Sequence, residues 1–411
     1  MSGAKLLSLE VLPAKKGDCL LLHYGTPASR KLWIIDGGPS DVYRPVLRQR
    51  LDALRGSQAS LEVELLMVSH HDDDHIKGIL DLCLDLDSQT GARPYRIHRL
   101  WHNSFQNLID LDPQGDGTVP AAVTAAFGAV SAHEQAMLAS VEQGHKLGAY
   151  ARKFGWAVNS AFATKVASFG QAPPPDLSAF APLEITMIGP MQSEVDALRK
   201  VYRAYLEKLA KGQQAEAEAA LAAYKDKSPA NLSSIVALLK HGGKSILLTG
   251  DARGDTVLKA LRELDLIGPG KVLKVDVLKL PHHGSDRNVE PDFFEAIQAD
   301  HYVFCGDGSH GNPERETLQM LFAARGDAGF TLHFNYRLKA IDAKRASEWA
   351  KEETRKQQAD PAYRIKRWSK ARQGLAPFLD KQRQSGRTFT LVEASQPPQG
   401  LVIDLLQPLG A

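Results

Sequence analysis

The sequence predicts an α/β layer fold whose functional groups lie where strands end. Apolar segments of strand length alternate with helical patterns along much of the chain, and several of these segments end in polar clusters that helices follow. The composition, with 43% apolar and 24% charged residues, is that of a globular protein. The length of 411 residues fits one enlarged domain or two ordinary ones.

The amino-terminal part is expected to begin with a hairpin. Residues 5–12 and 19–24 are largely apolar and are separated by the turn Lys16-Gly17-Asp18. Residues 32–35 form a short buried strand, which ends at Asp36-Gly37-Gly38-Pro39. These elements are typical of a strand-rich start to an α/β sheet.

A helix, a strand and a second helix follow in this order. Residues 42–55 have a helical pattern, and 61–68 is a strand that is continuously apolar from Leu65 onward. That strand runs directly into the polar segment 69–75, after which a helix is expected at 76–84. The polar segment therefore sits at a strand-to-helix turn.

Residues 106–232 are interpreted as a helical insertion. Alanine-rich helical stretches at 121–142 and 194–225 flank a proline-rich loop at 171–175, and a strand is expected at 183–188. After the insertion, the chain returns to the α/β pattern. Further strands are expected at 234–239, 245–248, 272–280 and 301–304, and a helix at 254–264.

The carboxyl-terminal part is basic. Residues 337–387 contain 15 Lys or Arg and 6 Asp or Glu, a local balance of +9, and 363–368 interleaves aromatic and basic side chains. A solvated helix face would have a similar composition. Residues 388–394 and 401–406 are expected to form a closing hairpin.

Composition and charge exclude several classes of protein. No 18-residue apolar run predicts a membrane span, and the amino terminus does not resemble a secretory signal. The net charge of +2 excludes a globally basic nucleic-acid coat. Cys19, Cys83 and Cys305 are too far apart for a CxxC pair, so neither a disulfide framework nor a cysteine zinc site is expected. A reducing cytoplasm is the expected compartment.

The segment SHHDDDHIKG at 69–78 is the strongest functional signal. Six consecutive side chains, from His70 to His75, can bind a divalent cation, and imidazole with carboxylate suits zinc, manganese or iron. A charged surface turn with helix-capping aspartates is the alternative. Two more apolar strands end in ligand-type groups, at LLTGD (247–251) and KLPHHGS (279–285). Three such strand ends together favour a metal centre.

These segments resemble the metallo-β-lactamase superfamily. The segment at 69–78 is similar to the HxHxDH pattern of that superfamily, with Asp72 where the second histidine usually stands. Together with NLSS at 231–234, LLTGD and KLPHHGS, it resembles the soluble metallo-β-lactamase domain of the competence DNA-uptake channel protein and its stand-alone relatives. The resemblance also takes in Lys16-Gly17-Asp18 and Ile35 to Gly38, and covers about 5–110 and 230–315.

The resemblance implies a four-layer αββα metallo-β-lactamase sandwich with a helical insertion and a basic C-terminal extension. It divides the chain into a hydrolase domain at 1–335, with the insertion at about 106–232, and an extension at 336–411 packed on the same domain. It also implies two divalent metal ions, zinc or manganese. The implied metal ligands are His70, Asp72, Asp74, His75, His102, Asp251 and His282.

Within this implied set, His70 and Asp72 would hold the first metal, and Asp74 and His75 the second, with Asp251 as the bridge. Either histidine of the pair at 282–283 could complete the second metal. His282 is preferred because it follows the strand directly, and His283 then faces the substrate. His102 is the candidate for a further ligand to the first metal, although a satisfied surface histidine is the alternative reading. Asp36 would orient the metal-binding loop. An aspartate at 72 shifts the metal preference toward manganese or mixed occupancy, against zinc alone.

The expected activity is hydrolysis of a phosphodiester in DNA or RNA by a metal-activated hydroxide. Asp74 would accept the proton of the attacking water, and His283 and Ser285 would be the other catalytic groups beside a phosphate oxygen. Asn231, Ser233 and His310 are candidate substrate-binding residues. For His310, the sequence has His-Gly-Asn-Pro where the resembling proteins often have a His-Pro pair.

Two other functions remain open at the level of sequence. The first is hydrolysis of a small ester, lactone or nucleotide, which a narrow pocket closed by the insertion would favour. The second is a non-catalytic module that binds a partner or nucleic acid. Nucleic acid or another phosphodiester is the expected partner, no membrane is expected, and protein partners or a homo-oligomer are left open by the sequence.

Overall fold

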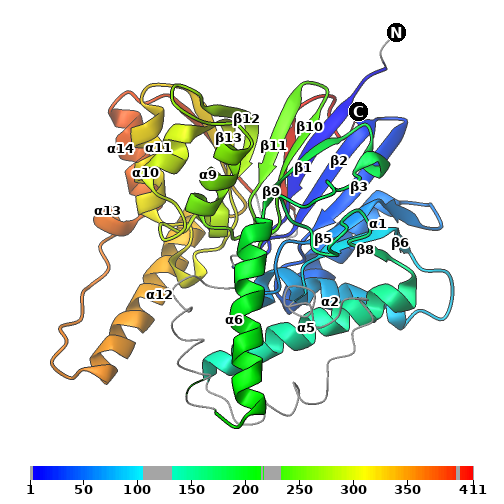
Figure 1. The fold of residues 1–411 in the computed structure, drawn as a ribbon. Coiled ribbons are helices and arrows are strands. Elements are labelled where there is room, and N and C mark those ends of the chain that lie inside the picture. The colour runs from blue at the N-terminus through cyan, green and yellow to red at the C-terminus, as the bar shows by residue number, and fades with distance from the viewer. Residues whose placement is uncertain (1–2, 105–131, 214–215, 217–232, 395–398, 411) are drawn as a thin grey trace.

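Two large β-sheets with helices packed on them form the body of the protein (Figure 1). The structure is a computed structural model and describes residues 3–104, 132–213, 216, 233–394 and 399–410. It confirms a mixed α/β architecture. Within these residues, no helix combines the length and apolar character needed to cross a membrane. Cys19, Cys83 and Cys305 are buried free thiols.

The first sheet has the strand order β16-β1-β2-β3-β5-β7-β8. Its β1, β2 and β3 form an antiparallel meander, as the expected hairpin requires, and β3, β5, β7 and β8 run parallel. The strands are β1 (Leu6–Val11), β2 (Leu20–Thr26), β3 (Ser29–Ile35), β5 (Leu65–Val68), β7 (Arg99–His102), β8 (Ala157–Val158) and β16 (Leu401–Asp404).

The second sheet has the strand order β15-β14-β13-β12-β11-β10-β9. Its first five strands run parallel to one another, and β9 and β10 extend it antiparallel. The strands are β9 (Glu184–Gly189), β10 (Val236–His241), β11 (Lys244–Leu248), β12 (Leu273–Lys279), β13 (Ile297–Phe304), β14 (Phe330–Phe334) and β15 (Phe389–Glu393). A separate pair consists of β4 (Leu61–Val63) and β6 (Tyr95–Ile97).

The helices follow most of the predicted ranges. They are α1 (Arg48–Arg55), α2 (Asp73–Asp87), α5 (Ala132–Phe154), α6 (Gln192–Ala210), α9 (Gly254–Glu263), α10 (Pro291–Ala296), α11 (Arg315–Arg325), α12 (Leu338–Ala359), α13 (Lys370–Gln373) and α14 (Leu375–Gln384). Short helical turns are η1 (Ser40–Val42), η2 (Tyr43–Leu47), η3 (Ser178–Phe180), η5 (Pro281–Gly284) and η6 (Ser309–Gly311). Of the two alanine-rich stretches, 121–131 and most of 214–225 lie outside the described residues.

Strand alternation explains how both faces of each sheet are buried. In β2, Leu20 and Leu22 join an apolar cluster shared by the two sheets, whereas Leu21 points to the opposite face, toward α1 and α2. In β11, Ile246 joins the same shared cluster, and Leu247 packs on the other face with residues of α9 and α11. Each sheet therefore buries one face against the other sheet and one face against helices.

Two predictions about strands are wrong. The expected strand at 61–68 is divided at Glu64, whose backbone N–H donates to the carbonyl of Leu32, so β4 pairs with β6 while β5 joins the first sheet. The expected closing hairpin does not form either. β15 pairs with β14 in the second sheet and β16 pairs with β1 in the first, because each strand completes the edge of a different sheet.

Candidate metal centre

The ends of five strands deliver polar side chains to one place. β3, β5 and β7 are parallel neighbours in the first sheet, and β11 and β12 are parallel neighbours in the second. The carboxyl ends of parallel neighbours lie at the same edge of a sheet, where α/β proteins commonly bind ligands. Residues at or just beyond these five ends are Asp36, His70, His75, His102, Asp251, His282 and His283.

Four histidines surround one carboxylate oxygen. The Oδ2 atom of Asp251 lies 3.6 Å from Nε2 of His70, 3.4 Å from Nε2 of His75, 3.7 Å from Nε2 of His282 and 3.5 Å from Nε2 of His283. His70 and His75 come from the end of β5 and the start of α2, and the other residues follow β11 and β12. The two sheets thus supply ligand-type groups to a common centre.

Several of these atoms are buried without a hydrogen-bond partner. They are Nε2 of His70, His75 and His283, and Oδ1 of Asp251. Burying polar atoms without partners costs free energy, so such atoms require an explanation. Single ligand atoms of Asp18, His75, Asp251 and His283 all lie within 4.8 Å of one another. This buried cluster could hold a metal ion, which would satisfy atoms that the protein itself leaves unpaired.

Asp36 fixes the orientation of His75. Its Oδ2 lies 2.9 Å from Nδ1 of His75, and its two oxygens accept hydrogen bonds from the backbone N–H and the hydroxyl of Ser69 at 2.7 and 2.6 Å. A carboxylate bonded to Nδ1 directs Nε2 of the same ring toward the centre. The supporting role expected for Asp36 is therefore consistent with its contacts.

Asp18 and Lys279 are site residues that the sequence analysis missed. Asp18 Oδ1 lies 3.0 Å from Nδ1 of His283, and its other oxygen forms an ion pair with Lys279, which is itself buried. The Lys279 ammonium also lies 3.8 Å from Oδ1 of Asp251 and donates to the carbonyl of Gly250 at 2.9 Å. A lysine near the end of the apolar strand β12 was the available signal, because buried lysines are rare unless paired.

The two histidines of η5 differ in their surroundings. Both hold a left-handed backbone conformation, with φ of 46° at His282 and 57° at His283. His283 is buried against Asp18, whereas the His282 side chain is 35% exposed and its Nδ1 lies 2.8 Å from Oδ1 of Asn288. Both rings approach Asp251, so the expected division into a ligand at 282 and a substrate-facing group at 283 stays a prediction. Their burial does not favour that division.

The aspartates at the start of α2 point in different directions. Asp72 Oδ2 lies 3.6 Å from Nε2 of His70, and Asp74 Oδ2 lies 3.7 Å from Nε2 of His283. Asp73 instead accepts a hydrogen bond from Gln143 of α5 at 2.7 Å and pairs with Lys77. Asp72 and Asp74 are thus brought to the predicted ligand set, and Asp73 connects two helices outside it.

His102 is buried at the end of β7, and neither of its ring nitrogens has a hydrogen-bond partner. Burial lowers the pKa of His102 to about 3, and the nearby His71 and His70 contribute in the same direction. The ring is therefore neutral at physiological pH, as a metal ligand must be. The structure excludes the surface histidine that was the alternative reading, and the ligand role stays a prediction.

The charges at the centre stabilise one another. Burial opposes the charged forms, but the carboxylates of Asp251 and Asp36 raise the pKa of His75 above its usual range. Asp251 and Asp18 act in the same way on His283, again against the effect of burial. In return His283 and His75 hold the pKa of the buried Asp251 well below its ordinary value. The buried carboxylates thus favour positive charge at the centre, from the histidines here or from a bound cation that would displace their protons.

The predicted substrate and catalytic residues have different outcomes. Ser285 lies just after η5, and its hydroxyl donates to Glu314 at 3.3 Å. Ser233 is buried, but the neighbouring Ser234 is the residue that contacts Asp251, by accepting a hydrogen bond from its backbone N–H at 3.2 Å. His310 is exposed on η6. Asn231 lies outside the described residues.

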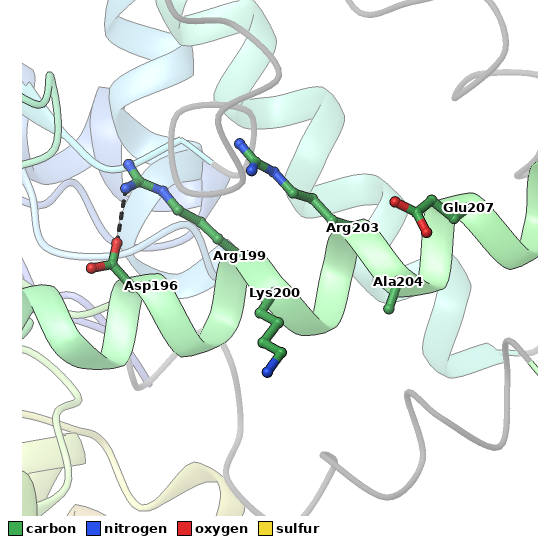
Figure 2. A pocket seen from close by; sticks show the side chains of 6 residues that line it. All are labelled: Asp196, Arg199, Lys200, Arg203, Ala204 and Glu207. Atoms are coloured by element: carbon green, nitrogen blue, oxygen red, sulfur yellow. Dashed lines mark hydrogen bonds and ion pairs between the residues drawn. The ribbon is translucent and has the colours of Figure 1, made fainter.

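One cavity of about 510 Å³ lies along α6 (Figure 2). Arg199 and Arg203 point to the same side of this helix, and Lys200 points away from them. Arg199 forms an ion pair with Asp196 at 3.0 Å. The described lining residues all belong to α6, and no predicted ligand is among them, so this cavity is separate from the metal centre.

Comparisons with known proteins give limited similarity. No protein-family model matches the chain. The chain is similar to ComE operon protein 3 of Bacillus subtilis (strain 168), with 28% identity over 119 residues that make up 27% of this chain and 15% of that protein. It is also similar to microtubule-associated protein 1A of Rattus norvegicus, with 29% identity over 92 residues, 22% of this chain and 3% of that protein. The chain thus spans a small part of each relative.

Proposed function

We propose that the protein has the four-layer metallo-β-lactamase sandwich and is a metal-dependent phosphodiesterase that acts on DNA or RNA. The observation that carries this proposal is the convergence of four histidine Nε2 atoms, each within 3.7 Å, on the Oδ2 atom of buried Asp251. The burial of each sheet between the other sheet and helices supports the fold. The resemblance of the strand-end motifs to the competence-channel domain supports the activity.

The donor set fits two divalent cations, zinc or manganese. His70, Asp72 and His102 would hold the first, and Asp74, His75 and a histidine of the pair at 282–283 the second. Asp251 would lie between them. When bound, such a pair of cations lowers the pKa of a coordinated water and neutralises charge that develops on a phosphate. The mixed oxygen and nitrogen ligands are compatible with either metal.

The protein's own groups supply the rest of the chemistry. Asp74 is the proposed acceptor of the water proton. Burial alone would raise its pKa, but His283 and His75 lower it, so the carboxylate is ionised and its Oδ2 carries no proton. Ser285 follows the pair at 282–283, and its hydroxyl, which here donates to Glu314, would turn to a phosphate oxygen when substrate binds. Asp18 holds His283 in place. Lys279 pairs with Asp18, and its ammonium also lies 3.8 Å from Oδ1 of Asp251.

Hydrolysis of a small ester, lactone or nucleotide is the second candidate. It is favoured by a cavity of about 590 Å³ that is lined mainly by residues of α2 and α5, including Lys77, Leu80 and Tyr150. Lys77 is on the same helix as Asp74, one turn further along. A small anionic substrate with an apolar part would fit such a lining.

The Asp251→Ala variant tests the proposed mechanism. We expect the purified wild-type protein to contain zinc or manganese and to cleave bis(p-nitrophenyl) phosphate and labelled DNA or RNA. The variant should remain folded, lose bound metal and lose turnover of every substrate, because the shared carboxylate is gone. Asp255→Ala is the matched control, since Asp255 is exposed on α9 and pairs only locally with Arg253. Unchanged turnover by the Asp251→Ala variant would rule out the mechanism.

Parallel assays with a lactone and a chromogenic ester decide between the two candidates. Cleavage of these compounds with no cleavage of any phosphodiester would favour the second. A wild-type protein that binds no metal and hydrolyses none of these compounds would instead favour the third possibility, a non-catalytic binding module.

A further inference from the structure

A basic arm projects from the body of the protein near the metal centre. We define the arm as α12 together with the extended segment 360–369, which follows it and leads to α13 (Figure 1). The helices α12, α6 and α5 all extend beyond the same end of the two sheets (Figure 1). This end also carries α2, whose first turn holds Asp74 and His75 of the centre.

Buried Glu353 fixes the extended segment against α12. Its carboxylate accepts hydrogen bonds from the Tyr363 hydroxyl at 3.0 and 3.1 Å and from the backbone N–H of Lys366 at 2.7 Å. The indole N–H of Trp349 donates to the carbonyl of Lys366 at 2.7 Å. Both backbone groups of Lys366 are thus bonded to α12, so this segment has a defined conformation.

Aromatic packing provides a second attachment. Trp368 packs edge-on against Trp349, with ring centroids 5.9 Å apart, and the Arg345 guanidinium lies 5.4 Å from the centre of the Trp368 ring. Glu353, Trp349 and Trp368 thus hold the extended segment against α12. The charged side chains that remain are therefore presented to solvent on a rigid support.

The cations of the segment are exposed and have no carboxylate partner. Arg364, Lys366 and Arg367 are exposed, and none of them forms an ion pair with another described residue. The half-buried Glu348 and Glu352 of α12 pair within the helix, with Lys351 and Arg355. Asp360, at the start of the segment, is exposed and accepts a hydrogen bond from the backbone N–H of Ala362. Positive charge therefore dominates the outer surface of the segment.

The base of the arm is attached to the rim of the metal centre. Arg345 of α12 donates to the carbonyl of Gly311 at 2.8 Å, and Asn312, the next residue, donates to the carbonyl of His282 at 3.2 Å. The loop that carries η6 thus contacts both α12 and a predicted ligand. A long molecule bound along the arm would therefore run toward the metal centre.

We propose that the arm binds the phosphate backbone of a polynucleotide and guides it to the metal centre. The cations are spread along a segment, which fits phosphates that recur along a chain better than the single phosphate of a small ester. The inference rests on the proposed phosphodiesterase function, because it names the kind of substrate that the arm presents to that same centre.

The test is a triple variant of the full chain, Arg364→Gln with Lys366→Gln and Arg367→Gln. We expect weaker binding of a labelled 30-nucleotide DNA or RNA, and a plot of log K against log salt that is shallower by about 2 to 3, because each lost phosphate contact removes about 0.7 to 0.9. Hydrolysis of bis(p-nitrophenyl) phosphate should be unchanged, since that compound does not reach the arm. Circular dichroism and thermal melting establish that the variant is folded.

The matched control replaces three exposed lysines by Gln: Lys240 on β10, Lys259 on α9 and Lys274 on β12. These substitutions remove the same amount of positive charge as the arm variant. It should bind the polynucleotide like the wild type. Equal binding and equal salt dependence in the arm variant and the wild type would overturn the inference, and so would equal weakening in the arm variant and the control.

Two further outcomes separate this inference from the proposed activity. Arm-dependent polynucleotide binding by a wild-type protein that cleaves no phosphodiester would support the binding surface and contradict the proposed function. Arm-dependent binding to vesicles of anionic lipid, with none to the polynucleotide, would contradict the inference and indicate a membrane surface as the partner.

Discussion

Asp36, His282 and His283 hold left-handed backbone conformations, with φ of 58°, 46° and 57°. Non-glycine residues adopt this region at a cost of about 1–3 kcal/mol each, and such residues cluster at functional sites where surrounding contacts enforce them. Here the enforcing contacts are visible, since each side chain is bonded to a neighbour: Asp36 to Ser69, His282 to Asn288 and His283 to Asp18. The strain is stored where ligand-type atoms must be aimed.

The first prediction concerns Asp36, which is bonded to Nδ1 of His75. Replacing Asp36 by Asn removes the negative charge behind the ring, and we expect metal affinity to fall by roughly 10–100-fold. Competition with a chromogenic chelator measures this change. Asp41→Asn, at an exposed position that pairs with Lys15, should leave the affinity unchanged. Equal affinities of the Asp36→Asn variant and the wild type would contradict the role assigned to Asp36.

The second prediction concerns Glu314, which accepts hydrogen bonds from the hydroxyl of Ser285 and the backbone N–H of Asp286. Burial and the neighbouring Asp286 raise the pKa of Glu314 to about 7, above the ordinary value of 4.5. The folded protein therefore keeps a proton that the unfolded chain has lost, and this group destabilises the fold progressively as the pH rises from about 4.5 to 7. Glu314→Gln removes the effect.

Chemical denaturation at several pH values tests this expectation. The unfolding free energy of the Glu314→Gln variant should increase relative to that of the wild type as the pH rises from 5 to 8. The reason is that only the wild type has a carboxyl at position 314 to ionise. Titrations of the remaining groups are common to both proteins and cancel in the difference. A difference that stays constant over this range would show that Glu314 titrates normally.

At the scale of elements, α2 packs closely on the loop after β3. The backbone N–H of Gly78 donates to the carbonyl of Gly38 at 2.8 Å, and that of Gly37 donates to the carbonyl of His75 at the same distance. A Cβ at position 78 would lie 1.9 Å from the carbonyl oxygen of Gly37, a separation that backbone atoms cannot accommodate. This contact sets the start of α2, and with it His75, against Asp36.

The third prediction follows from that contact. Gly78→Ala should lower the free energy of unfolding by about 1–3 kcal/mol, because the helix must move away from the loop. Denaturant unfolding gives the magnitude. Gly148→Ala in α5 is the matched control, since its added methyl group meets nothing nearer than an Arg152 nitrogen at 3.7 Å and alanine favours a helix. If both variants were equally stable, close packing would not explain the glycine at 78.

At the scale of the whole molecule, the centre lies where the two sheets meet. His70 and His75 belong to the first sheet and its helix, whereas Asp251, His282 and His283 follow strands of the second. An ion held by both sets would connect the two halves of the fold. Without it, the same buried atoms remain unpaired and disfavour the folded state.

The fourth prediction is that metal stabilises the whole fold. Free metal at about 100 times its dissociation constant should add about 2.7 kcal/mol to the unfolding free energy, provided that it does not bind the unfolded chain. Thermal melting with and without a chelator measures the effect. The Asp251→Ala variant should melt at the same temperature in both conditions. A wild-type protein indifferent to the chelator would contradict a resident ion at this centre.

Many strands, several helices and a large share of the ligand-type residues can be predicted from local patterns in the sequence. Strand ends are visible because an apolar run stops at a polar one, and His70 to His75, Asp251 and the pair at 282–283 follow such ends directly. The position of a strand end can therefore be predicted from residues that are adjacent in the sequence. The same local patterns predicted the hairpin of β1 and β2 and a helix at 76–84, which lies within α2 (Asp73–Asp87).

Contacts between groups that are distant in the chain become visible in the folded structure alone. Asp18 and Lys279 neutralise each other inside the protein although 260 residues separate them, and no local pattern reports such a pair. The last two strands join different sheets because the exposed edges that they complete, at β1 and β14, exist only once each sheet has formed. Burial and pairing are properties of assembled surfaces, so they appear only when distant segments meet.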